Sequence, residues 1–461
     1  MKMLTVTNPY DLSPLEELPM MSVDEVESIL CAARGLFEDR SQWLPAYQRI
    51  EILERTATLM TERVEELARL ACSEGGKPWK DSLVEVHRAI QGVKLAAEHI
   101  SQMKGEQIPM DQTAATTGRL AFTQREPIGV VCSISAFNHP LNLIIHQTVP
   151  AIAVGAPVII KPAEATPLSC LNFVSILKEA GLPDGWCQAV VCDNVLAEKL
   201  VIDPRVGFFS FIGSGRVGWY LRSKLAAGTR CALEHGGAAP VIVESDADLD
   251  TAVPLLAKGG FYHSGQICVS VQRIYAHESI IDQLANMLIE EMATITVGDP
   301  LSPDTDAGPL INPGEVKRVA TWVDEAVAGG ATLLAGGQTL SETCYQPTLL
   351  LSPPEDAKVS TMEIFGPVVC LYPYTERDSA IKRANQLPFA FQSAVFTRDL
   401  NTAIDSASKL NATAVMINDH TAYRADWMPF GGRDASGLGM GGIPHSMHEM
   451  TREKMIVIKR A

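Results

Sequence analysis

Apolar residues near the start of the chain recur at the three- and four-residue spacing of a helix. Segments 22–72 and 79–103 carry this pattern, with charged residues at the intervening positions. A helix of this kind buries one face against a core and leaves the other face to solvent. We therefore expect amphipathic helices over both segments.

From residue 129 the pattern changes to short, continuous apolar runs separated by helical stretches. The runs are "GVVCSIS" (129–135), "APVIIKP" (156–162), "CQAVVC" (187–192) and "VGFFSFIG" (206–213). The helical stretches are 141–153, 167–180, 194–202 and 215–226. Strands that are apolar on both faces and joined by helices form a parallel sheet, so these runs predict an α/β domain.

A second α/β pattern follows. "PVIVE" (240–244) and "QRIYAH" (272–277) flank a helical stretch at 248–262, and "ATLLAG", "PVVCLYPY", "SAVFT" and "ATAVMIN" come later. The chain closes on "EKMIVIKR" (453–460), a strand with no partner nearby in sequence. The stretch "RLAFTQRE" (119–126) indicates an extended strand. We interpret the fold as α/β, with two parallel Rossmann-type domains and a small piece built from residues 105–125 and the C-terminal strand.

Charge and composition narrow the possible partners. The 461 residues carry a formal net charge of −16, which disfavours non-specific binding to nucleic acid or to an anionic membrane. No uncharged apolar run approaches about 18 residues, and the N-terminus lacks the apolar core of a signal peptide. The ten cysteines show no CxxC pair and no zinc-finger spacing. We therefore expect no metal site and a reducing, cytoplasmic setting.

A glycine-rich loop follows one apolar run and opens a helix. Gly213, Gly215 and Gly218 of "FIGSGRVG" fit G-x-G-x-x-G, whose backbone approaches a pyrophosphate at a helix N-terminus. An ordinary glycine-rich turn gives the same letters, so both interpretations stay open. In the dinucleotide interpretation, Glu234 lies about 20 residues on and is a candidate ribose ligand.

Three more polar side chains follow other apolar runs, where open α/β sheets bind ligands. Lys161 and Glu164 of "VIIKPAEATP" have the chemistry to hydrogen-bond ribose hydroxyls, although a solvated loop with two charges is the simpler interpretation. Asn138 of "SAFNHPLN" offers an N–H donor, or forms only an Asx turn.

One cysteine has an unusual setting. "FYHSGQICVS" (261–270) places Cys268 after Gly-Gln, in a run of small and polar residues. Most cysteines of such a protein are small buried hydrophobes. A reactive cysteine needs access, a route to the thiolate and partners elsewhere in the chain.

Taken together, eight segments resemble the aldehyde dehydrogenase superfamily from about residue 22 to the C-terminus. They occur in the family's order: "FNHPL", "KPAEATP", "FIGSGRVG", "LEHGG", "SGQICVS", "GPLI", "MEIFGPV" and "FGGRDASGLG". No single segment is decisive, but eight in order are very specific. The resemblance implies a dinucleotide-binding domain (1–104 and 126–236), a catalytic domain (237–435) and an oligomerisation element (105–125 and 436–461).

By this resemblance Cys268 is the nucleophile that attacks the aldehyde carbon and forms a thiohemiacetal. The Asn138 amide and the Cys268 backbone N–H hold the oxyanion, and one such donor is typically worth about 3 kcal/mol. Hydride transfer to the nicotinamide leaves a thioester, and Glu234 activates the water that hydrolyses it. This role takes Glu234 away from the ribose. A glutamate there favours a free acid as the product, since acylating relatives usually lack it.

The resemblance also implies a nicotinamide cofactor. It assigns Lys161 and Glu164 to the adenosine ribose, Gly213 and Ser214 to the pyrophosphate loop, and Glu363 and Phe365 to the nicotinamide end. Because a carboxylate at Glu164 repels a 2′-phosphate, we expect NAD as the cofactor, with NADP also possible.

The substrate is less defined. "FNHPL", "SGQICVSVQRI" and the "YRADWMPFGGRDASGLG" tail resemble a branch that acts on small oxygenated or anionic aldehydes, with lactaldehyde, sulfolactaldehyde and phosphonoacetaldehyde dehydrogenases as neighbours. His139 and Arg424 are candidate ligands for a substrate anion. A packed histidine, and a surface salt bridge of Arg424 with Asp426 or Asp419, are nearly equal alternatives. Ile267 stands where phosphonate-specific relatives carry arginine, which argues against phosphonoacetaldehyde.

Other positions also depart from the commonest family residues: Phe137, His235, Ala238 and the pair Arg433-Asp434. We expect a homodimer or homotetramer in which the C-terminal strand extends a neighbour's sheet and covers its edge. Two rival functions remain, namely an acylating or esterase-type enzyme and a non-catalytic binding protein on this fold. The presence of Cys268, Glu234 and Asn138 together speaks against the second rival.

Overall fold

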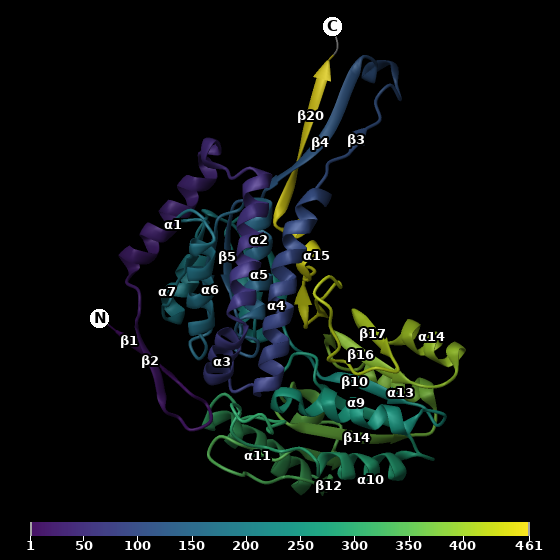
Figure 1. Ribbon diagram of the computed structural model, residues 1–461. Helices are drawn as coiled ribbons and strands as arrows, with labels where there is room; N and C mark the ends of the chain where they lie inside the picture. The colour runs from purple at the N-terminus through teal and green to yellow at the C-terminus, as the bar shows by residue number, and fades with distance from the viewer. Residues whose placement is uncertain (1, 460–461) are drawn as a thin grey trace.

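The computed structural model describes residues 2–459, which form two α/β bodies and a projecting arm (Figure 1). A six-stranded sheet lies at the centre of one body and a seven-stranded sheet at the centre of the other. Both sheets are parallel except for one short or edge strand each. The predicted α/β fold with two parallel sheets is confirmed.

The first sheet has the strand order β19-β9-β8-β5-β6-β7, and only β19 is antiparallel to its neighbour. Its strands are β5 (Val130–Ile134), β6 (Val158–Lys161), β7 (Cys187–Ala189), β8 (Val206–Ile212), β9 (Arg230–Glu234) and β19 (Gly437–Leu438). The helices of this body are α1 (Val23–Glu38), α2 (Ala46–Glu62), α3 (Val64–Gly75), α4 (Trp79–His99), α5 (Asn142–Val154), α6 (Leu168–Glu179), α7 (Asn194–Val201), α8 (Gly215–Arg222) and α15 (Ile443–Glu449).

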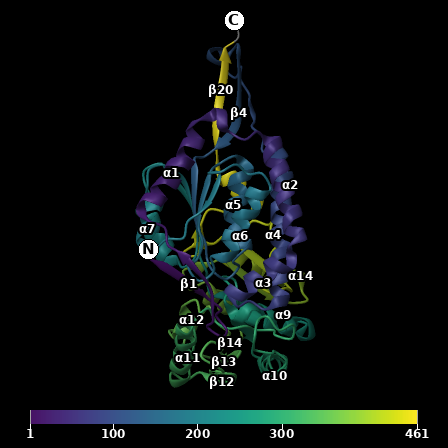
Figure 2. The ribbon, with the colours of Figure 1, turned by 60° about the vertical axis from the view of Figure 1, so that its left-hand side comes forward.

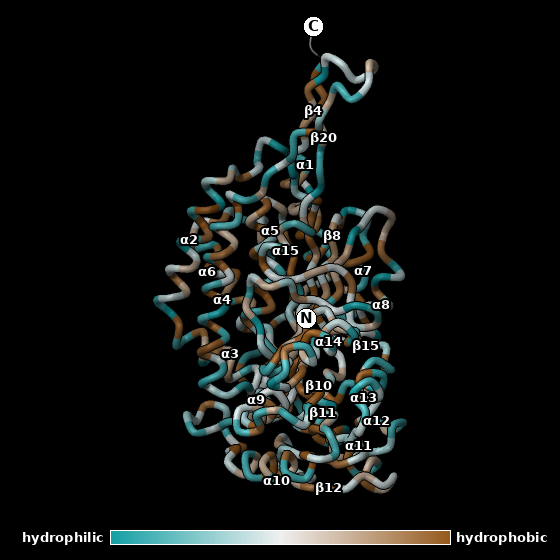
Figure 3. The backbone as a smooth tube through the Cα atoms, turned by 90° about the vertical axis from the view of Figure 1, so that its right-hand side faces the viewer, coloured by the Kyte–Doolittle hydropathy of each residue, from teal (hydrophilic) through white to brown (hydrophobic). Residues whose placement is uncertain are grey.

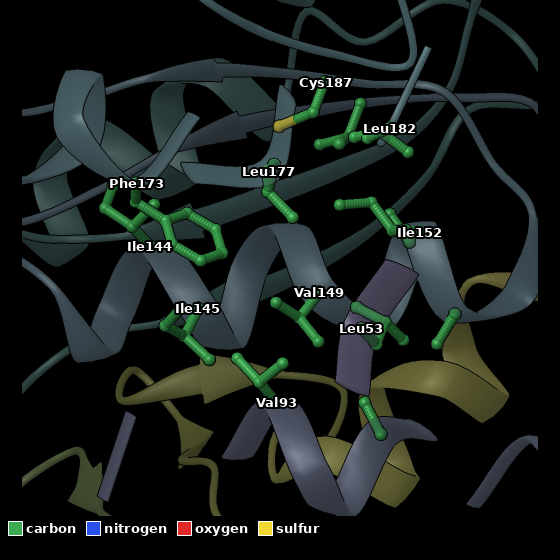
Figure 4. Close-up of a cluster of buried hydrophobic side chains, with 14 of the residues drawn as sticks. Leu53, Val93, Ile144, Ile145, Val149, Ile152, Phe173, Leu177, Leu182 and Cys187 are labelled. Atoms are coloured by element: carbon green, nitrogen blue, oxygen red, sulfur yellow. The ribbon is translucent and has the colours of Figure 1, made fainter. Parts of the chain in front are cut away.

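Neighbouring residues of the central strands point into two separate cores. Val131 and Phe208 face the core formed with α2, α4, α5 and α6, whereas Cys132 and Phe209 face the core formed with α1 and α7. Because side chains alternate along a strand, a strand covered on both faces is apolar at every position. Figure 2 shows α1 and α7 on one side of the sheet and α5 and α6 on the other, and Figure 4 shows part of the larger core.

The second sheet has the strand order β12-β13-β14-β11-β10-β16-β17, and the edge strand β12 is antiparallel to β13. Its strands are β10 (Ala239–Val243), β11 (Val271–His277), β12 (Thr332–Ala335), β13 (Thr348–Leu351), β14 (Val368–Tyr374), β16 (Gln392–Phe396) and β17 (Ala414–Ile417). The helices of this body are α9 (Leu249–Phe261), α10 (Ile281–Met292), α11 (Pro313–Ala328), α12 (Lys358–Thr361), α13 (Arg377–Ala384) and α14 (Leu400–Lys409). Helices α9 and α10 share a core with one face of this sheet, and α11 and α13 share a core with the other.

The arm consists of β3 (Gln107–Ile108), β4 (Arg119–Pro127) and β20 (Thr451–Lys459). β20 is antiparallel to β4 over its whole length, from Thr451 opposite Pro127 to Lys459 opposite Arg119. The partner that the C-terminal strand lacked nearby in sequence is therefore the predicted strand at 119–126, while Arg460 lies outside the described residues. Figure 3 shows the arm extending away from both bodies.

The segment before β20 returns to the first body. β19 pairs with β9, and α15 packs against α5 and α4 with Ile443 and Met447 fully buried in the larger core. Of the described residues 436–459, only those of β20 thus belong to the arm.

Several elements had no counterpart in the sequence interpretation. An N-terminal hairpin joins β1 (Met3–Thr7) to β2 (Pro14–Pro19), and a short pair joins β15 (Phe389–Ala390) to β18 (Arg433–Asp434). β9, which ends at Glu234, was not recognised either. The long helical pattern at 22–72 forms three helices, because the chain leaves the helical conformation between α1 and α2 and again at Arg63, whose φ is −118° and ψ 22°.

Within residues 2–459, no helix combines the length and the apolar character needed to cross a membrane. The same residues contain no group of three or more His, Cys, Asp or Glu side chains arranged to hold a metal ion.

Candidate functional site

A cavity of about 870 Å³ lies where the carboxyl ends of β5, β6, β8 and β9 face loops of the second body. In a parallel sheet this end is where ligands bind. The cavity is lined by eleven of the residues that the sequence singled out: Asn138, His139, Lys161, Glu164, Gly213, Ser214, Glu234, Cys268, Glu363, Phe365 and Arg424.

The loop before Cys268 has a left-handed backbone. His263, Ser264 and Gly265 have φ values of 48°, 54° and 71°, which costs of order 1–3 kcal/mol at each non-glycine residue. A Cβ on Gly265 would lie 2.1 Å from the carbonyl oxygen of Gly366. Glycine is therefore required where this loop meets the loop that carries Glu363.

Hydrogen bonds hold this strained loop in place. The Ser264 hydroxyl donates to the Gly308 carbonyl at 2.6 Å. The Gln266 amide donates to the Pro309 carbonyl at 3.1 Å, and its oxygen accepts from the Ile311 N–H at 2.9 Å. These bonds fix the backbone two residues before the partly exposed Cys268.

Asn138 meets the cysteine loop directly. It is 4% exposed, and its amide Nδ2 donates to the Gln266 carbonyl at 2.9 Å. The alternative of an Asx turn within its own segment does not describe this side chain, since its partner lies 128 residues away in the chain. An amide NH₂ has two donors, so one N–H is left for another acceptor.

Glu234 stands at the end of β9, and its nearest cation is Arg424, with Nη1 and Oε1 3.9 Å apart. Burial raises the pKa of Glu234, and the charge of Arg424 partly offsets this. Burial, followed by the charges of Glu234 and Glu363, also raises the pKa of the Cys268 thiol. The thiol is therefore protonated in this structure at neutral pH.

Arg424 is not a surface residue, and the proposed salt bridges with Asp426 or Asp419 are wrong. Its side chain is 10% exposed, and its guanidinium lies 3.6 Å above the centre of the Phe430 ring. Asp426 instead accepts two hydrogen bonds from Arg88, at 2.8 and 3.1 Å.

A histidine links Arg424 to that aspartate. The Nη2 atom of Arg424 lies 3.3 Å from Nδ1 of His146, and Nε2 of His146 lies 2.7 Å from Asp426. Because a guanidinium only donates, Nδ1 accepts and Nε2–H donates to the carboxylate. Burial lowers the pKa of His146 to about 4. This neutral histidine completes a polar chain from Glu234 through Arg424, His146 and Asp426 to Arg88.

His139 is a packed, hydrogen-bonded histidine that also lines the cavity. The ammonium of Lys77 donates to its Nδ1 atom, and its ring stacks on Tyr262 with ring centres 6.3 Å apart. Burial, and then the charge of Lys77, lower the pKa of His139 to about 4. With Nδ1 accepting, the neutral ring carries its proton on Nε2, so His139 offers an N–H donor and no positive charge.

On the other side of the cavity, Lys161 ends β6 and its Nζ lies 3.9 Å from Oε1 of Glu164. Ser214 immediately precedes α8, and no side chain caps the first turn of this helix. The glycine-rich loop therefore ends at backbone N–H groups that are free for an anion.

His235 stands where leucine is commoner in the family. Its ring packs against residues of the glycine-rich loop and of α8. Its ring lies edge-on to both Phe211 and Trp219, and its Nδ1 contacts the Gly213 carbonyl at 2.9 Å. A Cβ on Gly218 would lie 2.0 Å from this ring. The third glycine of the motif is thus needed for close packing.

Glu363 and Phe365 approach the cavity from the second body. The Oε1 atom of Glu363 is buried with no hydrogen-bond partner among residues 2–459. Burial raises the pKa of this carboxyl group to about 8, although Arg318 lowers it. Phe365 has a φ of 48° and meets Phe137 edge-on with ring centres 5.8 Å apart. An orphaned carboxyl oxygen beside an aromatic ring fits a ribose hydroxyl and a nicotinamide.

The sequence interpretation missed four charged or polar residues near the site: Lys77, Glu85, Arg88 and His146. Glu85 had a signal, since it lies on the apolar stripe of α4, three residues after buried Ser82 and four before buried Ala89. A charged residue on a buried stripe needs a partner.

The sequence profile of the aldehyde dehydrogenase family matches residues 1–456. A 3-sulfolactaldehyde dehydrogenase from Priestia aryabhattai is 38% identical over 457 residues, which cover 99% of this chain and 94% of that protein. Aldehyde dehydrogenase 21 from Physcomitrella patens, solved with the reaction product succinate, is 35% identical with a TM-score of 0.96 and covers 100% of this chain and 95% of its own. Glyceraldehyde-3-phosphate dehydrogenase GapN from Methanocaldococcus jannaschii, complexed with NADP, is 36% identical with a TM-score of 0.94 and covers 99% of both chains. The chain therefore belongs to the aldehyde dehydrogenase family and is an NAD(P)-dependent aldehyde dehydrogenase.

Proposed function

We propose that this chain oxidises a small anionic or hydroxylated aldehyde to its carboxylic acid, with Cys268 as nucleophile, Asn138 as oxyanion donor and Glu234 as base. The observation that carries the proposal is a single cavity in which these three residues lie beside the buried cation Arg424. Glu234 also favours hydrolysis over transfer of the acyl group to coenzyme A.

In the first step Cys268 gives up its thiol proton to solvent water, its sulfur bonds to the aldehyde carbon, and the carbonyl electron pair moves onto oxygen. The free N–H of the Asn138 amide and the Cys268 backbone N–H hold this oxyanion. Since burial and nearby carboxylates raise the pKa of the thiol, a positive charge brought into the cavity favours the thiolate.

A bound NAD(P) supplies the hydride acceptor. Its adenosine ribose fits Lys161 and Glu164, its pyrophosphate fits the loop of Ser214, and its nicotinamide ribose fits the unpartnered carboxyl of Glu363. Loss of hydride from the thiohemiacetal carbon leaves a thioester on Cys268. Glu234 then takes a proton from water as the water oxygen attacks the thioester carbon. The carbon–sulfur bond breaks, the acid departs, and Glu234 passes its proton to the sulfur of Cys268.

The substrate class is inferred from the cations and donors of the cavity. Arg424 and Arg88 both line it, and His139 adds a neutral N–H donor. A sulfonate or carboxylate suits a guanidinium, and a hydroxyl suits the histidine. The relatives named for 3-sulfolactaldehyde and solved with succinate support this class. Ile267 offers no charge beside Cys268, so phosphonoacetaldehyde is disfavoured.

Three further proposals concern the assembly of the enzyme, the roles of its domains and its cellular compartment. The arm is the oligomerisation element, because β20 exposes Met455, Val457 and Ile458, an apolar surface that a second subunit would cover in a homodimer or homotetramer. Residues 1–104 with 126–236, and 237–435, are the dinucleotide-binding and catalytic domains. Ten cysteines without a disulfide fit the reducing cytoplasm.

The test is NADH formation at 340 nm with matched aldehydes, butanal against succinate semialdehyde and propanal against lactaldehyde, with no coenzyme A present. We expect higher kcat/KM with the charged or hydroxylated member of each pair. Cys268→Ala is expected to abolish oxidation while NAD binding, followed by fluorescence, persists. Equal kcat/KM within each pair would refute the substrate class, and substantial turnover by the Cys268→Ala variant would refute the mechanism.

A further inference from the structure

A buried ion pair lies behind the loop that carries Asn138. Lys77, in the turn between α3 and α4, and Glu85, on α4, have side chains that are 0% and 1% exposed, and the Lys77 ammonium donates to Oε2 of Glu85. Burial alone would raise the pKa of Glu85, but the charge of the Lys77 ammonium, which also donates to this carboxylate, holds it well below its usual range. The carboxylate is therefore ionised throughout the physiological pH range.

The other oxygen of Glu85 caps α5. Oε1 accepts from the backbone N–H groups of Leu141 and Asn142, both at 2.9 Å. α5 begins at Asn142 and has no capping side chain of its own. A carboxylate from a different helix thus satisfies N–H groups that otherwise lack partners at a helix start.

The Lys77–Glu85 pair also contacts the segment just before α5, which carries Asn138. Lys77 donates to Nδ1 of His139, the residue after Asn138. At Gly75, next to this turn, a Cβ would meet Pro140 at 3.5 Å. The chain on the C-terminal side of Asn138 is therefore held through the side chain of His139 and through the backbone N–H groups of Leu141 and Asn142. Asn138 itself donates to the Gln266 carbonyl.

Stability alone is a weak reason for this arrangement. A buried ion pair loses hydration on both partners, and replacing such a pair with apolar residues of similar volume is often neutral or stabilising. An oxyanion donor, in contrast, loses its effect when its position shifts by a fraction of an ångström. Building on the roles proposed above for Asn138 and Cys268, we propose that Glu85 and Lys77 are positioning residues, which fix the Asn138 amide against the Cys268 loop.

The chain contains a matched control. Glu74, at the end of α3, is also fully buried, and it accepts from the backbone N–H groups of Leu168 and Ser169 at 2.7 and 2.8 Å. It caps α6 as Glu85 caps α5. However, α6 follows the loop of Lys161 and Glu164, and within residues 2–459 the Glu74 carboxylate has no hydrogen bond to the loop that carries Asn138.

The experiment compares Glu85→Gln with Glu74→Gln in the full-length enzyme, using p-nitrophenyl acetate without cofactor. Acylation of Cys268 by this ester forms an oxyanion, whereas alkylation of the same thiol by iodoacetamide does not. We expect Glu85→Gln to slow acylation about tenfold or more while alkylation changes less than about twofold. Glu74→Gln is expected to leave acylation within about twofold of wild type.

A double-mutant cycle separates positioning from general damage. If Glu85 acts through Asn138, the Glu85→Gln substitution has almost no further effect on acylation in the Asn138→Ala background. Multiplicative losses, or equal losses from Glu85→Gln and Glu74→Gln, overturn the proposal. If Glu85→Gln does not fold because Lys77 is left unpaired, the neutral pair Lys77→Met with Glu85→Gln takes its place in the cycle. The double variant keeps a capping oxygen at α5 but lacks the hydrogen bond from Lys77 to His139. The same outcomes support or overturn the proposal.

Discussion

The contact between Arg424 and Glu234 permits a direct test of the electrostatics that we assign to the base. Among residues 2–459, Arg424 is the one charge that lowers the pKa of Glu234. Arg424→Gln removes this charge and keeps a polar but shorter side chain. Both side chains are largely shielded from solvent, at 10% and 14% exposure, so solvent screening is incomplete.

The size of the effect follows from the separation of the two groups. Unit charges 3.9 Å apart interact by about 4 kcal/mol at an effective dielectric constant of about 20. Water that enters the vacated space offsets much of this. If about a third survives, the loss is close to 1.4 kcal/mol, which is a tenfold change in an ionisation equilibrium.

The sign is set by the chemistry of the base. Burial raises the pKa of Glu234, and Arg424 holds it down, so the substitution raises it further. Glu234 accepts a proton only when it is ionised, and deacylation is therefore lost as the pH falls through the pKa of Glu234. We expect the acidic limb of the deacylation profile to move to higher pH, with a rate about tenfold lower on that limb.

The assay follows decay of the acyl-enzyme formed from propanal, by quenched-flow sampling and intact mass between about pH 5 and pH 9. Propanal is neutral, so loss of a contact between Arg424 and a substrate anion does not contribute. Lys258→Gln is the control, because Lys258 lines the same cavity, is exposed, and has no ion pair with Glu234. An acidic limb that coincides for wild type and Arg424→Gln would refute the reasoning, as would an equal shift in Lys258→Gln.

Two further predictions concern the base and the cofactor. Glu234→Gln is expected to release a burst of NADH and then stall with the acyl-enzyme visible by intact mass, because an amide cannot take the proton from water; steady turnover at the wild-type rate would mean that another group activates water. Glu164→Gln is expected to raise the ratio of kcat/KM with NADP to that with NAD by up to about tenfold, since it removes a carboxylate that repels a 2′-phosphate. The gain is limited because Glu164 is 45% exposed and already pairs with Lys161, and a wild type that prefers NADP would show that Lys161 dominates the ribose site.

Most of the architecture was predictable because the sheets are covered on both faces. Such strands are apolar at every position, and the helices between them force parallel pairing. β9 was missed because its sequence "RCALE" begins with a charged residue and only Leu233 in it is deeply buried. The N-terminal hairpin was missed because "PLEELP" in β2 is exposed or half-exposed throughout, so burial leaves no pattern in its sequence.

The residues of the candidate site were predictable only where they belong to motifs that occur in the family's order along the chain. Cys268, Asn138 and Glu234 belong to segments that resemble the family in order, and the structure places all three at one cavity. The surroundings of Arg424 were not predictable, since its neighbours His146 and Glu234 are 278 and 190 positions away in the chain. The alternative of a surface salt bridge with Asp426 or Asp419 failed because nearness in sequence says little about which side chains meet; Asp426 instead accepts hydrogen bonds from Arg88.

Some of the costly features of this fold lie where the cavity needs fixed geometry. His263, Ser264 and Phe365 adopt left-handed backbones next to Cys268 and Glu363, and Lys77 and Glu85 lose their hydration behind Asn138. The apolar cores do not require any of these features, because the cores already fix the strands and helices around them. The strands end before the reacting atoms, however, and loops without such restraints are mobile on the scale that matters to an oxyanion donor. Strain in the cysteine loop and buried charge behind the Asn138 loop therefore have one physical effect, which is to hold Cys268 and Asn138 in a single relative position.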